Sequence, residues 1–467
     1  MNKLKIYISA LAVALILFQG CDGLLDVDPQ QSVDSEDAIT TAEDVNSVLV
    51  GAYDALGDGD LYGGWIQMTG DLLASEGNMS FIGTFFGPRE IANKNQLYDN
   101  GQLTSTWVDA YNTINITNNV LANLELLDEF DAPRVEGEAK LIRGLMYFEL
   151  VRLFAATYEA GQVNDQAGVP IILEPTGLIT DEDNTPRSSV EDVYTLILND
   201  LNDAKNLLSI SNPEESYYGN SLVASAVLSR VYLQQGEYED ARDEANRVIE
   251  EGNYSLARSS EIGGSDFAAA FNNESNTPED IFAMQNTNQD GTNSFITFYA
   301  EDSRGDIVIS EGHLDEYEAN DDRLNLFYSV GSDVFTGKWD EEPDSEINSA
   351  NNVNLIRLAE MYLTRAEGNF RLGEDVGDTP LNDINIIRDR VNLDPLLIGE
   401  LDLDAILLER KFELMFEGNL LHDLKRTQRD VGSRTYDDPK LVLPIPRRDI
   451  DVNSNLCQNP TYTGPQC

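Results

Sequence analysis

The sequence predicts a mostly α-helical protein in which helical hairpins form a scaffold, with irregular loops and a few short strands between them. Apolar residues recur at three- and four-residue spacing over several long segments, which places them on one face of a helix. Segments rich in Gly, Asn, Asp and Ser separate these helices. With 467 residues, 41% of them hydrophobic, the chain can bury a sizeable core as one large domain or two closely packed lobes.

The clearest helical pattern covers residues 221–250. Val227 and Val231 lie on the apolar face of a first helix, which Gly236 interrupts. Small and apolar residues such as Ala241 then resume at the same spacing, so a second helix folds back and packs against the first. Such a hairpin leaves an apolar flank uncovered, and we therefore expect the rest of the chain to supply further helix pairs.

The same spacing predicts helices elsewhere along the chain. They cover residues 41–56, 105–127, 136–156, 190–208, 355–372, 380–391 and 405–426. Ser188 and Ser189 are candidate N-caps for the helix that begins at Val190. VPIILEP at 169–175 is predicted to be a short extended segment, and the strand candidates are IFAMQ at 281–285 and SFITFYA at 294–300.

Charge and targeting signals restrict where the protein acts. The 83 acidic and 31 basic residues give a net charge of -52, which repels polyphosphate backbones and excludes nucleic acid as a partner. At the N-terminus, Lys3 and Lys5 precede an apolar run over residues 6–18, and Gly20-Cys21 follows. This layout predicts an export signal at residues 1–20. The small residue followed by Cys resembles a bacterial lipobox, in which Cys21 would be lipidated; an ordinary secretory signal with a chance Cys is the alternative.

The remaining two cysteines lie near the C-terminus. Cys457 and Cys467 could close a small loop in an oxidising compartment, and two unpaired thiols fit the sequence equally well. Between the export signal and the first helix, residues 21–40 form a polar tether.

Residues 65–101 are the first candidate binding surface. This stretch combines large aromatic rings with many turn-forming residues, a composition typical of recognition loops held on a rigid scaffold. Any single ring could instead attach the loop to the core. A second aromatic group lies at Phe295, Phe298 and Tyr299.

Several segments together resemble a known family. They include the Gly20-Cys21 signal, GEAKLIRGLMYFELVRLF at 137–154, LIRLAEMYLTRAEG at 355–368, ERKFELMFEG at 409–418 and LPIPRRDIDVNSNL at 443–456. LSRVYLQQGEYEDA, at 228–241, looks like a tetratricopeptide (TPR) unit. In this order, the segments resemble the SusD/RagB family of Bacteroidetes outer-membrane lipoproteins over nearly the whole chain. The resemblance divides the chain into an N-terminal region at 41–260 with TPR-like hairpins and a C-terminal region at 261–467.

The resemblance implies a function. Members of this family capture oligosaccharides outside the cell and hand them to a SusC-like, TonB-dependent barrel, so we expect a lipid-anchored protein of the outer membrane that faces outward. Sugar binding needs flat rings against pyranose C–H faces and planar polar groups for the hydroxyls. The expected glycan-binding residues are Trp65, Asn78, Phe85, Phe86, Arg89, Tyr98, Phe298 and Tyr299. The negative charge favours neutral glycans.

Two other functions are weighed against glycan binding. A glycoside hydrolase would need two carboxylates at a set separation, and a chain with 83 acids offers no motif that identifies such a pair. His313 and His422 are far apart in sequence and neither belongs to an HExxH motif, so we expect no zinc hydrolase, no catalytic residues, no metal and no cofactor. The loop GDGDLYGG at 57–64 matches neither a phosphate-binding loop nor an EF-hand. The third reading is a TPR-type protein adaptor without a sugar ligand.

Overall fold

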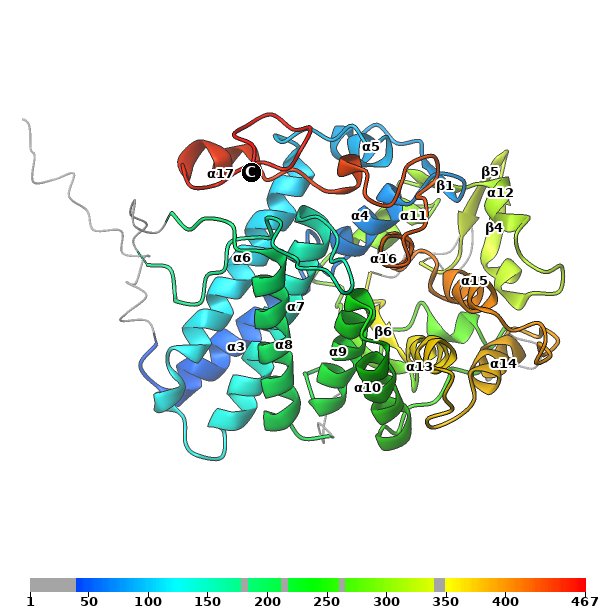
Figure 1. The fold of residues 1–467 in the computed structure, drawn as a ribbon, viewed down its shortest axis with the longest axis horizontal. Helices are drawn as coiled ribbons and strands as arrows, with labels where there is room; N and C mark the ends of the chain where they lie inside the picture. Colours follow the sequence, from blue (N-terminus) through cyan, green and yellow to red (C-terminus); the bar gives the residue numbers. More distant parts are fainter. Residues whose placement is uncertain (1–38, 178–183, 211–216, 260–264, 340–348) are drawn as a thin grey trace, which may run out of the picture.

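A computed structural model describes residues 39–177, 184–210, 217–259, 265–339 and 349–467 (Figure 1). The export signal, Cys21 and nearly all of the tether lie outside the described residues. Within them the protein is mostly α-helical, which confirms the predicted fold class. None of the described helices is both long enough and apolar enough to cross a membrane.

The scaffold is a row of helices in which each packs on the next. In chain order they are α3 (Ala42–Leu56), α6 (Gly101–Leu121), α7 (Ala132–Phe154), α8 (Val190–Leu207), α9 (Ser221–Gln235), α10 (Tyr238–Glu251), α13 (Leu358–Leu372) and α14 (Pro380–Arg390). Figure 1 shows α8, α9, α10 and α13 side by side. The row crosses from the N-terminal to the C-terminal part of the chain at the contact between α10 and α13.

Local signals in the sequence set the helix ends. Asn220 caps α9, because its side chain accepts hydrogen bonds from the backbone N–H of Leu222 and Val223. Gly236 ends α9 with φ = 77°, a left-handed conformation that costs glycine little. Ser189 caps α8 as predicted, and its hydroxyl accepts a hydrogen bond from the N–H of Asp192 at 3.0 Å.

Buried ion pairs fix neighbouring helices to one another. The guanidinium of Arg143 on α7 donates two hydrogen bonds of 2.8 Å to Asp200 on α8 and one of 3.0 Å to Asn118 on α6. Arg230 on α9 donates to both carboxylate oxygens of Glu360 on α13, at 2.8 and 2.6 Å. Charge-assisted pairs of this kind specify which helix faces meet.

Three small antiparallel ladders contain the strands of the described residues. β1 (Met79–Phe81) pairs with β3 (Ile307–Ile309), β2 (Asp280–Met284) with β6 (Val353–Arg357), and β4 (Phe327–Val330) with β5 (Asp333–Thr336). β2 confirms the strand predicted at 281–285. Residues 169–175 form no strand; side chains hold this segment, as when the Tyr111 hydroxyl donates to the carbonyl of Pro170 at 2.8 Å.

Two predicted elements are wrong. Residues 294–300 form helix α11 (Ser294–Tyr299) and not a strand, because Asn293 caps it by accepting a hydrogen bond from the N–H of Ile296. The helix predicted over 405–426 is two helices, α15 (Leu403–Leu414) and α16 (Leu420–Arg426). Phe416 and Gly418, with φ of 63° and 80°, break the helical path between them.

The remaining elements are short. They are α4 (Trp65–Leu73), α5 (Phe86–Ala92), α12 (Glu311–Leu314), α17 (Arg447–Val452) and the 3-10 turns η1 (Leu124–Leu126), η3 (Ala268–Ala270), η4 (Asp322–Leu326) and η5 (Pro439–Leu441). The stretch 65–101, expected to be mostly irregular, therefore contains two helices. Cys457 and Cys467 form a disulfide, which confirms the paired alternative.

Candidate functional site

A surface pocket of about 440 Å³ lies where three distant segments meet. We call it the tyrosine pocket. Its walls come from the end of α3 and the loop after it, from the residues that precede α9, and from the end of β2 and the loop after it. The lining residues are Val50, Tyr53, Asp54, Gly57, Asp58, Gly59, Tyr217, Tyr218, Ala283, Met284, Gln285, Asn286 and Asp290.

Three tyrosine rings form the aromatic wall of this pocket. The rings of Tyr53 and Tyr218 meet edge to face with centroids 5.0 Å apart, and Tyr217 stands 6.1 Å from Tyr218. The hydroxyl of Tyr53 accepts a hydrogen bond from the N–H of Gly219 at 2.8 Å, which ties the segment before α9 to α3. Tyr217 is 36% exposed, so its ring faces solvent over a large part of its surface. Such a wall offers flat apolar area with polar tips.

Carboxylates and amides form the polar part of the pocket. The amides are held in place, since Gln285 Nε2 donates to Asn276 Oδ1 at 2.7 Å and Asn286 Nδ2 donates to the carbonyl of Asn351 at 2.8 Å. Asp290 accepts a hydrogen bond from the N–H of Thr287 at 2.7 Å. The lining residues include no Lys or Arg. The pocket therefore combines rings, amides and negative charge.

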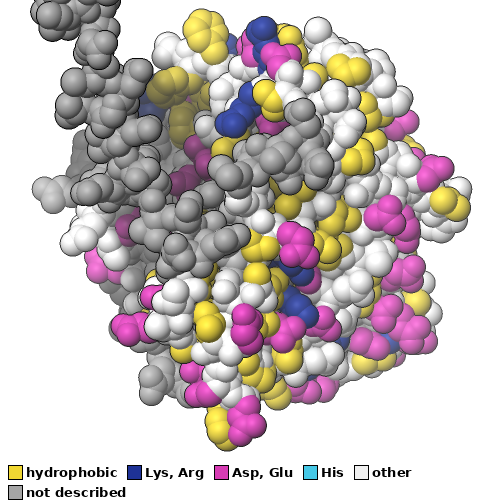
Figure 2. Space-filling model, turned by 90° about the vertical axis from the view of Figure 1, so that its left-hand side faces the viewer, with side chains coloured by type: hydrophobic (Ala, Val, Ile, Leu, Met, Phe, Trp, Pro, Cys, Tyr) yellow, Lys and Arg dark blue, Asp and Glu magenta, His cyan; other side chains and the backbone are white. Residues whose placement is uncertain are grey.

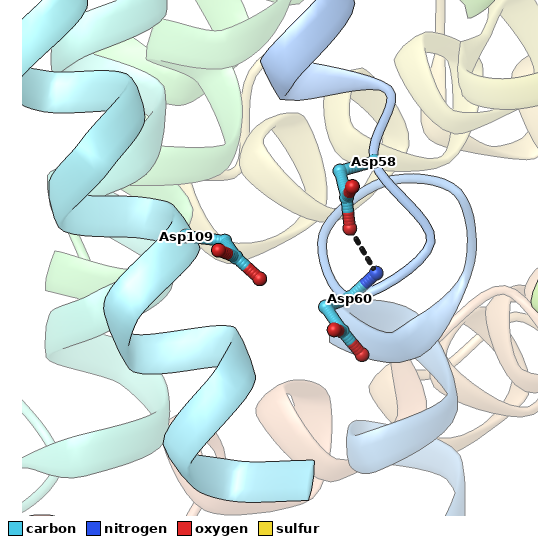
Figure 3. Close-up of side chains that lie close together, drawn as sticks. All are labelled: Asp58, Asp60 and Asp109. Atoms are coloured by element: carbon cyan, nitrogen blue, oxygen red, sulfur yellow. Dashed lines mark hydrogen bonds between the residues drawn. The ribbon is translucent and has the colours of Figure 1, made fainter. Parts of the chain in front are cut away.

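An acidic group lies beside the tyrosine pocket. Oxygen atoms of Asp58, Asp60 and Asp109 all lie within 4.8 Å of one another, with Asp109 pointing from α6 toward the loop (Figure 3). Asp58 Oδ1 accepts a hydrogen bond from the N–H of Asp60 at 2.8 Å. Burial, followed by repulsion from Asp58 and Asp60, raises the pKa of Asp109. Carboxylates so close could hold a hard cation such as Ca²⁺. The three residues come from the loop after α3 and from α6, so they do not form the EF-hand pattern tested above.

The structure corrects four of the predicted glycan-binding residues. Trp65 (5% exposed), Asn78 (7%), Phe298 (6%) and Tyr299 (0%) are buried and offer no surface to a glycan. The helical turns of α4 and α11 direct these rings into the core, where Trp65 meets Phe298 edge to face at 5.0 Å. The hydroxyl of Tyr299 donates to Asp71 at 3.0 Å. For these rings the alternative stated above, that a ring packs in the core, is correct.

The other four predicted residues lie nearer the surface. Phe85 and Phe86 are 49% and 78% exposed at the start of α5, and the Arg304 guanidinium covers the Phe85 ring at 4.1 Å. Arg89 is half-buried and donates a 2.5 Å hydrogen bond to a backbone carbonyl, while half-buried Tyr98 lies beneath a guanidinium of α17. None of the eight predicted residues lines the tyrosine pocket.

Sequence reasoning missed the tyrosine pocket because its parts are far apart in the chain. Tyr53 sits within a helical pattern, and Gln285 ends a predicted strand. The adjacent pair Tyr217-Tyr218, next to Gly219, was the signal that could have drawn notice, since paired exposed rings before a helix cap suit recognition.

Comparison with known proteins finds SusD-like proteins. A SusD-like family model described as "Starch-binding associating with outer membrane" matches residues 24–233. SusD-like protein P2 of Formosa agariphila is 24% identical over 99% of this chain and 100% of its own length. A SusD superfamily protein of Bacteroides thetaiotaomicron with a solved structure superposes with a TM-score of 0.79 at 26% identity, covering 90% of this chain and 100% of that chain. The chain is therefore similar to SusD-like proteins over nearly its whole length.

Two further similar proteins are named for the carbohydrates that they bind. The starch-binding protein SusD of Bacteroides thetaiotaomicron is 30% identical over 31% of each chain. A laminarin-binding SusD-like protein has the same fold, with a TM-score of 0.71 at 23% identity over 91% of this chain and 100% of that chain.

Proposed function

We propose that this SusD-like protein captures oligosaccharide or polysaccharide at the cell surface in the tyrosine pocket and delivers it to a SusC-like, TonB-dependent transporter. The main support for the proposal is the tyrosine pocket, because three tyrosine rings and fixed amide side chains line its volume of about 440 Å³. Rings can cover the C–H faces of a sugar while amides and carboxylates bind its hydroxyls. The family description, starch-binding and associated with the outer membrane, supports this assignment.

The charge around the pocket sets the class of glycan. Asp54, Asp58 and Asp290 line it without a Lys or Arg among the lining residues, and the whole chain carries -52. Figure 2 shows one face of the molecule, on which Asp and Glu are spread widely while Lys and Arg are few. A sulfated or uronic-acid-rich glycan would be repelled here, so the ligand is a neutral glycan.

Attachment to the outer membrane follows from the N-terminal segment. Residues 1–20 direct export, Cys21 carries the lipid, and residues 21–40 separate the anchor from the helical regions at 41–260 and 261–467. Cys21→Ala is expected to give soluble periplasmic protein. Membrane-retained, lipid-labelled Cys21→Ala protein would contradict the anchor.

Binding and not hydrolysis is the proposed activity. The test incubates the purified protein with a panel of neutral and anionic glycans and scores both retention and product release. Retention without new reducing ends supports a binding protein, and product release supports a glycoside hydrolase. If the protein neither retains a glycan nor releases product, the adaptor is supported.

A matched pair of variants locates the glycan site. Tyr217→Ala should weaken binding of the retained glycan about 10-fold, as for an aromatic residue at the centre of a binding surface. Phe86→Ala is the control, because Phe86 is 78% exposed and lies outside the tyrosine pocket. If only Phe86→Ala weakens binding, the site is the aromatic loop predicted from the sequence and not the tyrosine pocket.

A further inference from the structure

A second surface pocket, of about 240 Å³, lies between the segment after α7, helix α16 and the segment around Tyr436. Thr157, Glu159, Gln162, Lys425, Tyr436 and Asp437 line it. It shares no lining residue with the tyrosine pocket. Its volume lies below the roughly 300–1,000 Å³ of pockets for drug-sized ligands, so it suits a ligand of about one sugar ring.

Lys425 forms the inner wall of this second pocket and lacks a charge partner. The residue is 3% exposed, and within the described part of the chain Nζ donates one hydrogen bond, to the carbonyl of Leu441 at 3.4 Å, with no carboxylate in ion-pair range. Burying an ammonium without a counter-charge is costly. The chain has 83 acidic residues, and Glu159 and Asp437 line the same pocket, yet none of the described acids forms an ion pair with this cation.

Two other buried lysines show how the protein ordinarily satisfies such a group. Lys338 pairs with Glu417 at 2.6 Å. Lys94 has no carboxylate, but its three N–H groups donate to two carbonyls and to Ser75 at 2.8–3.1 Å. Lys425 has one long hydrogen bond, which leaves two N–H groups for another acceptor.

The surroundings of Lys425 favour an anion as that acceptor. A small cavity behind it joins Lys425 to Arg152 and His422, and the hydroxyl oxygen of Thr157, which lines both spaces, is buried without a hydrogen-bond partner. The Arg152 charge is already paired with Glu149. Burial lowers the pKa of Lys425 to about 8, so the group remains mainly protonated at neutral pH.

We propose that the second pocket binds a small polar ligand with one carboxylate, about the size of a sugar ring, and that this carboxylate pairs with Lys425. Glu159 and Asp437 are exposed and line the same pocket. They repel an acid group, so the ligand presents its carboxylate to Lys425 and its hydroxyls to Glu159, Asp437 and Gln162. A free sugar acid and the uronic-acid end of a saccharide share this chemistry.

Titration calorimetry of the full chain with D-glucuronate, D-glucose and a glucuronate-terminated disaccharide tests the proposal. Glucuronate should bind at least about 10-fold more tightly than glucose, because glucose lacks the charge-assisted hydrogen bonds. If the disaccharide binds as tightly as glucuronate, the ligand is the uronic-acid end of a saccharide. If glucuronate binds and the disaccharide does not, the ligand is a free sugar acid. Tyr217→Ala should leave glucuronate binding unchanged, so the result is independent of the glycan site.

Two kinds of variant keep the test decisive. Lys425→Met should weaken glucuronate binding by roughly 10- to 100-fold while circular dichroism stays unchanged. If that variant does not fold, Glu159→Gln provides the second measurement, since removing this exposed carboxylate should raise glucuronate affinity at low salt and less at high salt. Equal binding of glucose, no glucuronate binding at millimolar concentration, or unchanged affinity in both variants would overturn the proposal.

Discussion

Replacing Glu360 by Gln should destabilise the fold by about 3 kcal/mol at neutral pH. Glu360 is 1% exposed and joins α13 to Arg230 on α9 and, at 3.2 Å, to Arg410 on α15. Burial by itself raises the pKa of this carboxyl, but the charges of Arg230 and Arg410 outweigh burial and lower the pKa from 4.5 to about 2. A pKa lowered by somewhat more than 2 corresponds to about 3 kcal/mol, at about 1.4 kcal/mol for each pKa unit.

The pH dependence of this loss has a defined sign. Because the folded pKa of Glu360 lies below its unfolded value, the ionised carboxylate stabilises the protein above the unfolded pKa, and this contribution disappears as pH falls toward about 2. Gln resembles the protonated carboxyl. The stability difference between wild type and Glu360→Gln should therefore stay constant from about pH 8 to 5 and narrow below about pH 4.5.

Urea unfolding followed by circular dichroism at pH 7, 5, 4 and 3 measures this difference. Glu239→Gln is the control, since the Glu239 side chain is 75% exposed and stands 3.9 Å from Arg242; such a surface pair contributes about 0–1 kcal/mol. A loss below about 1 kcal/mol for Glu360→Gln at pH 7, or a difference that does not change with pH, would refute the electrostatic account of this contact.

Two further predictions concern buried groups of α4. Trp65→Ala should cost about 3–5 kcal/mol in urea unfolding and leave glycan affinity unchanged, because the ring is 5% exposed and packs on Phe298; weaker glycan binding without loss of stability would return Trp65 to the binding surface. Burial raises the pKa of Asp71 to about 7 despite the hydrogen bond from Tyr299, so the folded state favours the protonated carboxyl and wild type should lose stability from about pH 4 to 7. In thermal melts, wild type should have a lower melting temperature at pH 8 than at pH 5, and Asp71→Asn should not show this decrease. An equal change of melting temperature in both proteins would contradict the prediction.

The sequence predicted the scaffold well because its signals are local. The period of the apolar residues, the Ser189 cap and the left-handed Gly236 each act within one or two turns of helix. Residues 294–300 were misassigned because a short apolar run fits a buried helix as well as a strand. The cap at Asn293 then decided in favour of the helix.

The candidate site was harder to predict because it depends on contacts between distant segments. Composition singled out residues 65–101, but it could not tell that α4 turns Trp65 inward while Phe86 remains 78% exposed. Tyr53 and Tyr218 meet only because α3 and the segment before α9 pack together, through a hydrogen bond that spans 166 residues. A single sequence contains no local trace of such a contact.

The distribution of charge links the two pockets. Arg323, Arg357 and Arg390 are among the largest fully buried side chains, and each pairs with carboxylates inside the protein. Their carboxylate partners are a small part of the 83 acidic residues, and they are Glu279, Asp321, Glu409, Glu413 and Glu417. Salt screens a surface field beyond about 10 Å at 0.1 M. Repulsion of a long anionic glycan should therefore weaken as salt rises, whereas a small acid in contact with Lys425 responds mainly to that one cation.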